Sequence, residues 1–517
     1  MTDDKRRKAG GGGPTTESHA DGRKDDRRWA TRASSDIPHS SRSDLRHCAL
    51  DIEETSLKYM LRLATPMVVT TVSFTIMQFV DRFMVSRLGT DALAAILPAG
   101  FASFVPGGFV IGAMTSLNTF VSQSLGRGDR RACANYYWQA AYMGFMYFAV
   151  VVAVMWPAAP WIFKMMGQPP AIIGMEVIYL RIILYSQIVA VINWSSGQFY
   201  MGIHRPIITM CASLCGQVVN VIVNYILIFG KFGFPRMEIA GAGWGTFTGI
   251  TVAAGINMVI FLSRRVNDRF QSRRAFGVHF GRMADLLKVG LPAGFGLMVN
   301  VAFWGVILVA LVGRFGTDAL AATSAVLAFT SLSVMPVVGI GTALTAAVGK
   351  AIGRGRKNLA MRQTSVCLRV SLVYMGLVGI GFFLFRHRLM TFWTTDPERD
   401  RGVMETGANI LICAAVYQIF HAARTIYSGA LRGAGDTVWL AIVSGAGAVI
   451  ILWLGGALMA MVFPGLGALG PWMAAAMSII LVGLANGWRF KSRRWMDIDL
   501  FKRGEPSVPI RDGVPVE

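Results

Sequence analysis

The chain has 517 residues, of which 54% are hydrophobic and only 15% are charged, and its formal net charge is +21. Soluble domains carry about 25% charged residues, so this composition excludes an ordinary soluble protein and indicates an integral membrane protein. The positive charge does not indicate a nucleic-acid partner, because beyond residue 60 the Lys and Arg gather in short segments between apolar runs. Basic segments of this kind are typical of cytoplasmic loops.

The amino-terminal segment differs from the rest of the chain. Its first fifty residues hold eleven Lys or Arg and eight Asp or Glu, with a glycine run at Gly10–Gly13. Such a composition cannot bury enough apolar surface to fold. It also has no apolar stretch followed by a cleavage site, so a cleaved signal peptide is not expected. We predict a disordered cytoplasmic tail over residues 1–55.

Twelve apolar segments follow. The hydrocarbon core of a bilayer is about 30 Å thick, and a helix needs roughly 20 apolar residues to cross it. An even number of spans places both termini on one side, and the basic segments 126–135, 264–286 and 351–365 place that side in the cytoplasm. We therefore predict an all-α integral protein of the cell membrane with both termini cytoplasmic. The predicted spans are 62–86, 99–125, 136–162, 177–201, 206–230, 239–263, 287–312, 324–350, 366–386, 406–430, 438–462 and 468–490.

The first span contains an acid, Asp81. A charged side chain at the centre of a membrane helix costs about 2.5–3.5 kcal/mol even on insertion scales, so such a residue indicates a function. Asp81 is the clearest acid away from the ends of the predicted spans, and we take it as a candidate for binding a coupling cation. The alternative is an acid at the membrane interface, paired with Arg82 or Arg87.

The phrase GTDALAA occurs twice, at Gly89–Ala95 and at Gly316–Ala322, 227 positions apart. The same offset relates Leu125–Gly128 to Ile352–Gly355. At each GTDALAA we expect Gly to end one helix and Thr or Asp to cap the next. The offset predicts two lobes of six helices each, which repeat in the same membrane orientation and open a central cleft alternately to either side. The predicted parts are the amino lobe 56–265, a cytoplasmic linker 266–286, the carboxy lobe 287–491 and a cytoplasmic tail 492–517.

Prolines mark the first two spans of each half. Pro66 and Pro292 are expected to open the first span, and Pro106 and Pro336 lie inside the second. Proline inside a membrane helix removes a backbone hydrogen bond, which permits bending.

Amide side chains are the predicted partners of Asp81. Asn220 and Asn224 are four residues apart and share a face of the fifth span, and Gln217 lies one turn earlier. Gln78 lies close to Asp81 on the first span by the same periodicity. These amides can donate to a carboxylate or offer carbonyl oxygens to Na⁺. The alternative is that they hydrogen-bond between helices as packing residues.

Several stretches resemble the multidrug and toxic compound extrusion (MATE) family of transporters. FVDRFMVSRLGTDALAA (Phe79–Ala95) resembles the signature of its first span, and GALRGAGDT (Gly429–Thr437) resembles its tenth-span exit motif. VNYILIFGKFG (Val223–Gly233) and GAGWGT (Gly241–Thr246) are similar to its fifth and sixth spans. The resemblance implies a secondary antiporter that exports cationic, amphipathic compounds in exchange for H⁺ or Na⁺. It also implies that Asp81 is the coupling carboxylate and that Thr246 belongs to the cation network.

Two positions depart from the pattern of Na⁺-coupled members, in which acids of the seventh and tenth spans form a cation site in the carboxy lobe. Here those positions hold Asn300 and His421. Neither supplies a negative charge, so a Na⁺ site in the carboxy lobe is not expected and we favour H⁺. His421 could itself couple, because imidazole titrates near neutrality, or it could be a hydrogen-bonded packing residue.

The remaining expectations concern partners. We predict no metal, no cofactor other than the coupling H⁺ or Na⁺, no nucleic acid, and a monomer that meets small organic cations and membrane lipids. The substrate cleft cannot be assigned. An enzyme is not expected, because no cluster of acids and no His/Ser constellation is found. The main alternative is a flippase for lipid-linked oligosaccharides or lipid precursors, for which only Arg424 and Arg181 offer inward cationic groups.

Overall fold

The computed structural model describes residues 54–166, 170–303, 308–392 and 401–501. Within these ranges every regular element is a helix, and twelve helices are long and apolar enough to cross a membrane. Eleven of the predicted spans are confirmed as helices, and for the predicted span 287–312 the spanning helix is α10, which ends at Ala302, with the short helix α11 (Leu308–Gly313) beyond residues that lie outside the described ranges. The predicted tail 1–55 lies outside the described residues except for its last two. The spanning helices are α3 (Leu57–Ser86), α4 (Thr90–Gly126), α5 (Arg130–Met165), α6 (Pro170–Gly202), α7 (Ile207–Phe229), α8 (Glu238–Phe261), α10 (Phe280–Ala302), α12 (Thr317–Gly353), α13 (Lys357–Thr391), α14 (Arg401–Ala434), the continuous run α15, η2 and α16 (Thr437–Val462), and α17 (Leu469–Lys491).

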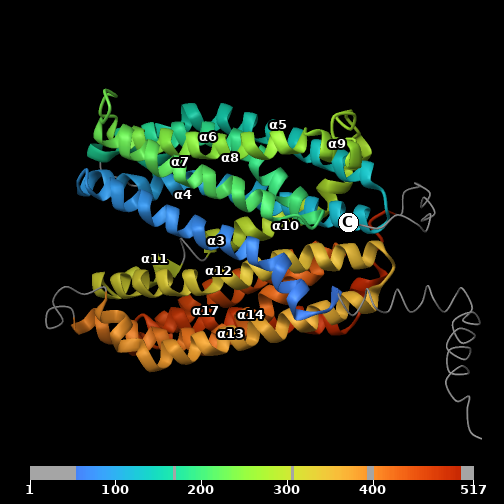
Figure 1. Cartoon of the computed structure of the whole chain (residues 1–517). Coiled ribbons are helices and arrows are strands. Elements are labelled where there is room, and N and C mark those ends of the chain that lie inside the picture. Colours follow the sequence, from blue (N-terminus) through green and yellow to red (C-terminus); the bar gives the residue numbers. More distant parts are fainter. Residues whose placement is uncertain (1–53, 167–169, 304–307, 393–400, 502–517) are drawn as a thin grey trace, which may run out of the picture. The chain divides into compact units, whose positions relative to one another are not determined.

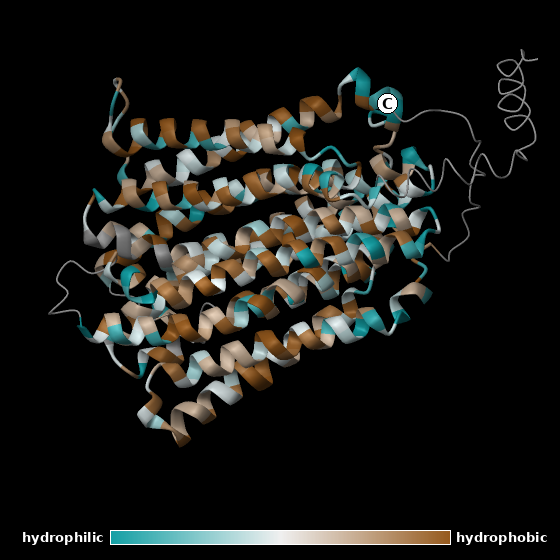
Figure 2. Cartoon of the chain, turned by 60° about the horizontal axis from the view of Figure 1, so that its bottom comes forward, coloured by the Kyte–Doolittle hydropathy of each residue, from teal (hydrophilic) through white to brown (hydrophobic). Residues whose placement is uncertain are grey.

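Figure 1 shows the helices running side by side, with α4 to α8 in one group and α12 to α14 with α17 in another. We call α3–α8 the amino half and α10–α17 the carboxy half. Figure 2 shows apolar residues along the helices and hydrophilic residues gathered at their ends. We call the end that carries residues 126–131, 264–274 and 353–357 the basic end, and the other the opposite end.

The helices begin earlier than the apolar runs alone indicate. Helix α3 starts at Leu57, where the Ser56 side chain accepts a hydrogen bond from the Tyr59 backbone N–H as an N-cap. The prediction that Pro66 and Pro292 open their spans is therefore wrong, because both lie inside helices. The predicted linker is also partly helical. Its short helix α9 (Arg264–Phe270) buries Phe270, which packs into the apolar core of the amino half.

The two GTDALAA phrases adopt the same turn. Gly89 has φ of 124° and Gly316 has φ of 99°, conformations that favour glycine, and each is the N-cap residue of the helix that follows. The expectation that Gly ends one helix is confirmed. The expectation that Thr or Asp occupies the cap is wrong, because the helix already begins at the threonine.

The internal repeat is visible as matched contacts between the halves. Gly112 on α4 lies against α10, where an added Cβ would be 2.7 Å from the Ala293 carbonyl oxygen. Its repeat equivalent, Gly339 on α12, lies against α3, with a Cβ 2.8 Å from the Val68 backbone nitrogen. At the basic end, Gly126 meets the Lys350 carbonyl oxygen, and the equivalent pair is Gly353 with Gln123. The halves therefore pack about a pseudo-twofold axis that relates parallel helices.

Polar contacts reinforce the junction near the basic end. Thr119 donates to the carbonyl oxygen of Arg432 at 2.8 Å, and Gln123 donates to that of Gly433 at 2.9 Å. The segment after α17 also reaches the amino half, because Phe501 packs edge-on against Phe120 and lies 3.9 Å beneath the guanidinium of Arg127. The first ten residues of the predicted tail 492–517 thus pack on the helices, and the rest lie outside the described residues.

Candidate cation-coupling site

The candidate site is built around Asp81, which is half-buried on α3. The side-chain nitrogen Nδ2 of Asn224 on α7 donates to Asp81 Oδ1 at 2.7 Å. The same nitrogen lies 3.3 Å from Oδ1 of Asn220, one turn earlier on α7. Asn220 and Asn224 are 1% and 0% exposed. The structure therefore brings together three of the residues predicted from the sequence.

Glycines on α8 hold the two asparagines in place. Gly245 sits against the Asn224 side chain, and a Cβ added to Gly249 would lie 2.7 Å from the Asn220 Cβ. Small residues allow membrane helices to approach closely. The asparagine side chains therefore lie where α7, α8 and α3 meet, with Asn224 packed against Gly245 of α8 and hydrogen-bonded to Asp81 of α3.

Two buried polar atoms of this group have no partner within the part of the chain that the structure describes. They are Nδ2 of Asn220 and Oδ1 of Asn224. Leaving a buried polar atom unpaired costs about 1–3 kcal/mol, so the group has spare capacity to bind. A donor, an acceptor and a carboxylate within one cluster can hold a proton, a water or a small cation.

The other predicted amino-lobe residues do not join this cluster directly. The Thr246 hydroxyl donates to the Ala242 carbonyl oxygen of its own helix at 3.0 Å. Gln78 and Gln217 are half-buried, and among the described residues neither shares a hydrogen bond with Asp81. Their role in coupling stays a prediction.

The alternative of an interfacial ion pair is not supported. In the described ranges Asp81 forms no ion pair with Arg82 or Arg87, and the Arg87 guanidinium lies 4.9 Å from the centre of the Phe83 ring. Asp81 is instead held by a neutral amide, which leaves its charge uncompensated by a salt bridge.

Asn300 and His421 of the carboxy half do not form a comparable cluster. Both are half-buried, on α10 and α14. Nδ1 of His421 lies 3.3 Å from the Thr425 hydroxyl on the same helix. No hydrogen bond between Asn300 and His421 is present in the described residues, so a joint role for them stays a prediction.

The sequence analysis missed one buried acid. Glu176 on α6 is 0% exposed, and both of its carboxylate oxygens lack a partner among the described residues. One turn further, Tyr179 lies close enough to Asp81 for the two groups to interact electrostatically. Glu176 was missed because the predicted span began at 177, whereas α6 begins at Pro170. Proline is typical of the first helical position, so Pro170 was the available signal.

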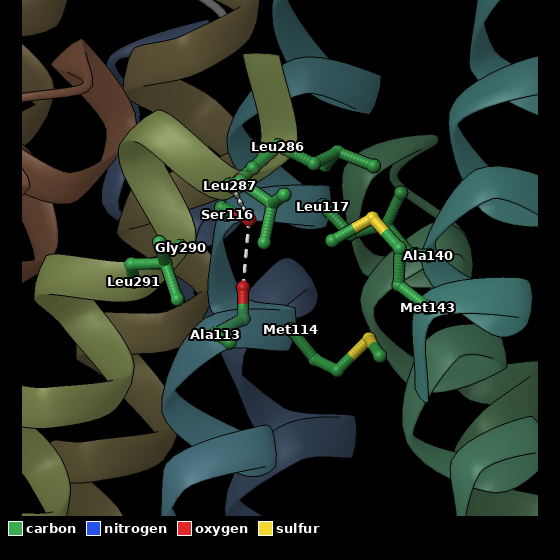
Figure 3. Close-up of a pocket in the computed structure, with 10 residues that line it drawn as sticks. All are labelled: Ala113, Met114, Ser116, Leu117, Ala140, Met143, Leu286, Leu287, Gly290 and Leu291. Carbon is green, nitrogen blue, oxygen red and sulfur yellow. Dashed lines mark hydrogen bonds between the residues drawn. The ribbon is translucent and has the colours of Figure 1, made fainter. Parts of the chain in front are cut away.

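In the described part of the chain, no group of three or more His, Cys, Asp and Glu side chains could hold a metal ion. A small apolar pocket lies between α4, α5 and α10 (Figure 3). Its one polar side chain, Ser116, donates to the backbone carbonyl of Ala113 at 2.7 Å, so the pocket offers little to recognise a charged compound.

Within the described residues, twelve helices able to span a membrane, arranged in two repeated halves with a half-buried carboxylate between helices, are typical of a membrane transporter. More particularly, the chain belongs to the MATE family, because the MatE family model matches residues 66–226 and 292–455. Family membership and the twelve candidate spans among the described residues together show that the protein is a multi-pass membrane protein.

Curated relatives extend the comparison. The chain is 29% identical over 433 residues to a "Probable multidrug resistance protein NorM" of Chromobacterium violaceum, a match covering 82% of this chain and 90% of that protein. It is 27% identical over 390 residues to the multidrug resistance protein PmpM of Pseudomonas aeruginosa, covering 74% and 79%.

Solved structures confirm the fold. A MATE crystal structure in complex with MaL6 superposes with a TM-score of 0.77 at 18% identity, covering 84% of this chain and 95% of that one. A mutant of the Vibrio cholerae MATE transporter VcmN gives a TM-score of 0.75 at 16% identity, covering 86% and 99%.

Proposed function

We propose that this protein is a secondary antiporter that exports cationic, amphipathic organic compounds in exchange for H⁺, with Asp81 as the group that binds and releases the proton. The observation that carries the proposal is the 2.7 Å hydrogen bond from Asn224 to Asp81 within a membrane helix, where Asp81 forms no ion pair with any residue that the structure describes. An acid in this position is costly to keep charged, so its protonation state can respond to a gradient.

The helix contacts suggest how protonation could reach the rest of the molecule. The negative form of Asp81 accepts the Asn224 hydrogen bond and ties α3 to α7, and the neutral form accepts it less strongly. Helix α3 also packs on α12 of the carboxy half at Val68. Helix α3 therefore contacts both halves. A change in the strength of its Asn224–Asp81 hydrogen bond can alter how the two halves pack, as alternating access requires.

The substrate class and the orientation belong to the same proposal. The relatives NorM and PmpM are named multidrug resistance proteins, which supports export of varied organic compounds. The basic segments 126–131, 264–274 and 353–357 meet at one end, which supports cytoplasmic termini, and the one basic run at the opposite end of a described helix that the sequence singles out is Arg386–Arg388. We further propose that the protein works as a monomer in the cell membrane, without nucleic acid, enzymatic activity or a cofactor other than the coupling ion.

The test is export of ethidium, a fluorescent cation, from proteoliposomes with pH and Na⁺ gradients imposed separately. We expect a pH gradient without Na⁺ to drive export by the wild type, and Asp81→Asn to insert normally but lose gradient-driven export. Asp318→Asn is the matched control, because Asp318 is an exposed acid in the first turn of α12. Wild-type rates from Asp81→Asn would refute the role of Asp81. Export that requires Na⁺ and ignores pH would replace H⁺ with Na⁺, held by Asp81 and the Asn224 carbonyl oxygen.

A further inference from the structure

A histidine bridges the two halves near the basic end. His204 lies in the turn between α6 and α7 and is half-buried. Its Nδ1 lies 3.1 Å from the Tyr59 hydroxyl of α3, and its Nε2 lies 3.3 Å from the carbonyl oxygen of Ala346 on α12. A carbonyl oxygen only accepts hydrogen bonds, so Nε2 carries the proton of the neutral ring and Nδ1 accepts from the hydroxyl. The neutral imidazole therefore satisfies both contacts and connects the amino half to α12.

The junction that His204 bridges is closed in this structure. The Asn118 side-chain nitrogen donates to the Thr342 carbonyl oxygen at 3.4 Å, and the contacts of Thr119 and Gln123 with the end of α14 follow toward the basic end. Alternating access requires the two halves to separate at this end in one of its two states. Separation would break the bond between His204 and α12 and bring the ring into water.

Two cations of α12 lie near the ring. Lys350 and Arg354 are close enough to His204 to act on it electrostatically, and both pair with Glu54, each at 3.0 Å. One carboxylate shared by two cations leaves this group with a net positive charge. Burial and the charge of Lys350 lower the pKa of His204 well below its ordinary value of 6.5, and they outweigh the carbonyl oxygen of Ala346, which acts in the opposite direction. The closed junction therefore favours the neutral ring.

The other elements around the ring supply no compensating charge among the described residues. Helix α4 packs on the end of α6 at Gly202 through Val121 and the backbone of Asn118, which are uncharged. Within the turn itself, Arg205 is exposed and of the same sign as the two cations. His204 forms no ion pair with an acid that the structure describes. A proton on the ring would therefore add to a positive charge that is already present.

These contacts make the junction sensitive to pH. We propose that His204 is a pH sensor at the basic end, where the neutral ring holds the two halves together and the protonated ring favours their separation. The inference rests on the alternating access of the proposed function and adds a regulatory site to it. This site is distinct from Asp81, which lies toward the other end of α3. Because the basic end is proposed to be cytoplasmic, a fall in cytoplasmic pH shifts the protein toward the state that receives its substrate.

The direction and size of the effect follow from the protonation of His204 in the two states. In the closed junction its pKa lies well below 6.5, and in the separated halves the hydrated ring regains a pKa of about 6.5. Closure is therefore favoured fully above about pH 6.5, and this advantage declines as the pH falls below that value. Between about pH 7.5 and about pH 5.5, the ratio of separated to closed molecules should rise about tenfold.

The test measures the distance between the halves at the basic end. Spin labels are attached to Arg131→Cys on α5 and Asn358→Cys on α13, in a full-length chain whose native cysteines are replaced by alanine. Both positions are exposed, and the offset of 227 makes them equivalent in the repeat. Double electron–electron resonance of this protein in phosphatidylcholine nanodiscs gives the populations with short and long distances. We expect the ratio of long to short distances to rise about tenfold from about pH 7.5 to about pH 5.5.

Three histidine variants separate the sensor from other effects of acid. His204→Gln keeps a donor for the Ala346 carbonyl oxygen but cannot take up a proton, so the short distance should dominate at both pH values. His204→Lys carries a permanent charge beside Lys350, so the long distance should dominate at both. Either variant decides the matter if the other does not fold, because each removes the titration near neutrality. His279→Gln is the matched control, an exposed histidine at the same end, and should respond to pH as the wild type does.

Asp81→Asn separates the sensor from the coupling carboxylate. The labelled Asp81→Asn variant should keep the tenfold response at the basic end. The proposal is overturned if the wild type shows no response to pH, if the response persists in His204→Gln, or if Asp81→Asn abolishes it. Failure of the antiport mechanism is seen separately, as gradient-driven export of ethidium by Asp81→Asn.

Discussion

At the scale of single residues, the hydrogen bond between Asn224 and Asp81 sets how readily the carboxylate is protonated. Asn224→Ala removes the donor and should favour the neutral acid, because an amide N–H stabilises the charged form. We expect export to persist and the midpoint of its pH dependence to move upward by about one unit, since a charged hydrogen bond is worth about 1.5–3 kcal/mol. The measurement is the initial rate of dye export across a series of pH values. An unchanged midpoint would show that the bond does not influence coupling.

Glu176 offers a test of stability at the same scale. Its carboxylate oxygens are buried and unpartnered among the described residues, and an unpaired buried polar group costs about 1–3 kcal/mol. Glu176→Met should therefore raise the thermal midpoint of the purified protein. Glu405→Met is the comparison, because Glu405 is exposed and pairs with Arg401 one turn away, and it should change stability by less than about 0.5 kcal/mol. A clear loss of stability in Glu176→Met would contradict the structural description of this residue.

At the scale of elements, ion pairs connect the segment just before α3 with the end of α12. Glu54 lies 3.0 Å from Lys350 and 3.0 Å from Arg354. Burial raises the pKa of the Glu54 carboxyl, but the two adjacent cations more than offset this effect and hold the pKa below its ordinary value of 4.5. The pairing therefore stabilises the fold fully above that ordinary value and is lost as the pH falls through the lower, folded value.

The corresponding variant is Glu54→Gln. We expect it to lower the stability of the purified protein by about 1 kcal/mol at neutral pH, as for a partly exposed ion pair. The difference from the wild type should diminish as the pH falls below 4.5 and through the lower pKa of the folded state, since the wild-type carboxyl then becomes neutral as well. Thermal midpoints of both proteins across a series of pH values from neutral to acid provide the measurement. A difference that persists in acid would mean that the carboxylate charge is not the cause.

The sequence predicted elements better than the contacts between them. Twelve spans could be predicted because each apolar run is long enough to cross a bilayer. Helix ends could not, since residues such as Ser56 and Pro170 extend a helix beyond its apolar core. The pairing of Asp81 with Asn224 was predicted from helical periodicity and family resemblance. The separation of Thr246 from Asp81 was not predictable, because the rotation of α8 is set by glycine contacts with α7 that no single-helix pattern reveals.

At the scale of the whole molecule, the two halves meet through glycine contacts that the repeat duplicates. A Cβ at Gly112 would lie 2.7 Å from a backbone atom of α10, and a Cβ at Gly339 would lie 2.8 Å from a backbone atom of α3. Backbone cannot move aside as a flexible side chain can. These two positions therefore fix how closely the halves approach, and they do so at equivalent places in the repeat.

Gly112→Ala should force α4 away from α10, and we expect it to lower stability by about 1–3 kcal/mol, as overpacking does, and to slow export. Gly108→Ala is the matched control one turn away, because a Cβ there meets nothing within 4 Å. This control should keep or gain stability, since alanine in place of glycine at an open helical position adds up to about 1 kcal/mol. Gly339→Ala should reproduce the effect of Gly112→Ala, since the repeat places it in the equivalent contact. Thermal midpoints and export rates of the three variants test the idea. Equal thermal midpoints and export rates in Gly112→Ala and Gly108→Ala would show that the contact of Gly112 with α10 does not limit how closely the halves approach. A defect in Gly112→Ala that is absent from Gly339→Ala would show that the two repeat-related contacts are not functionally equivalent.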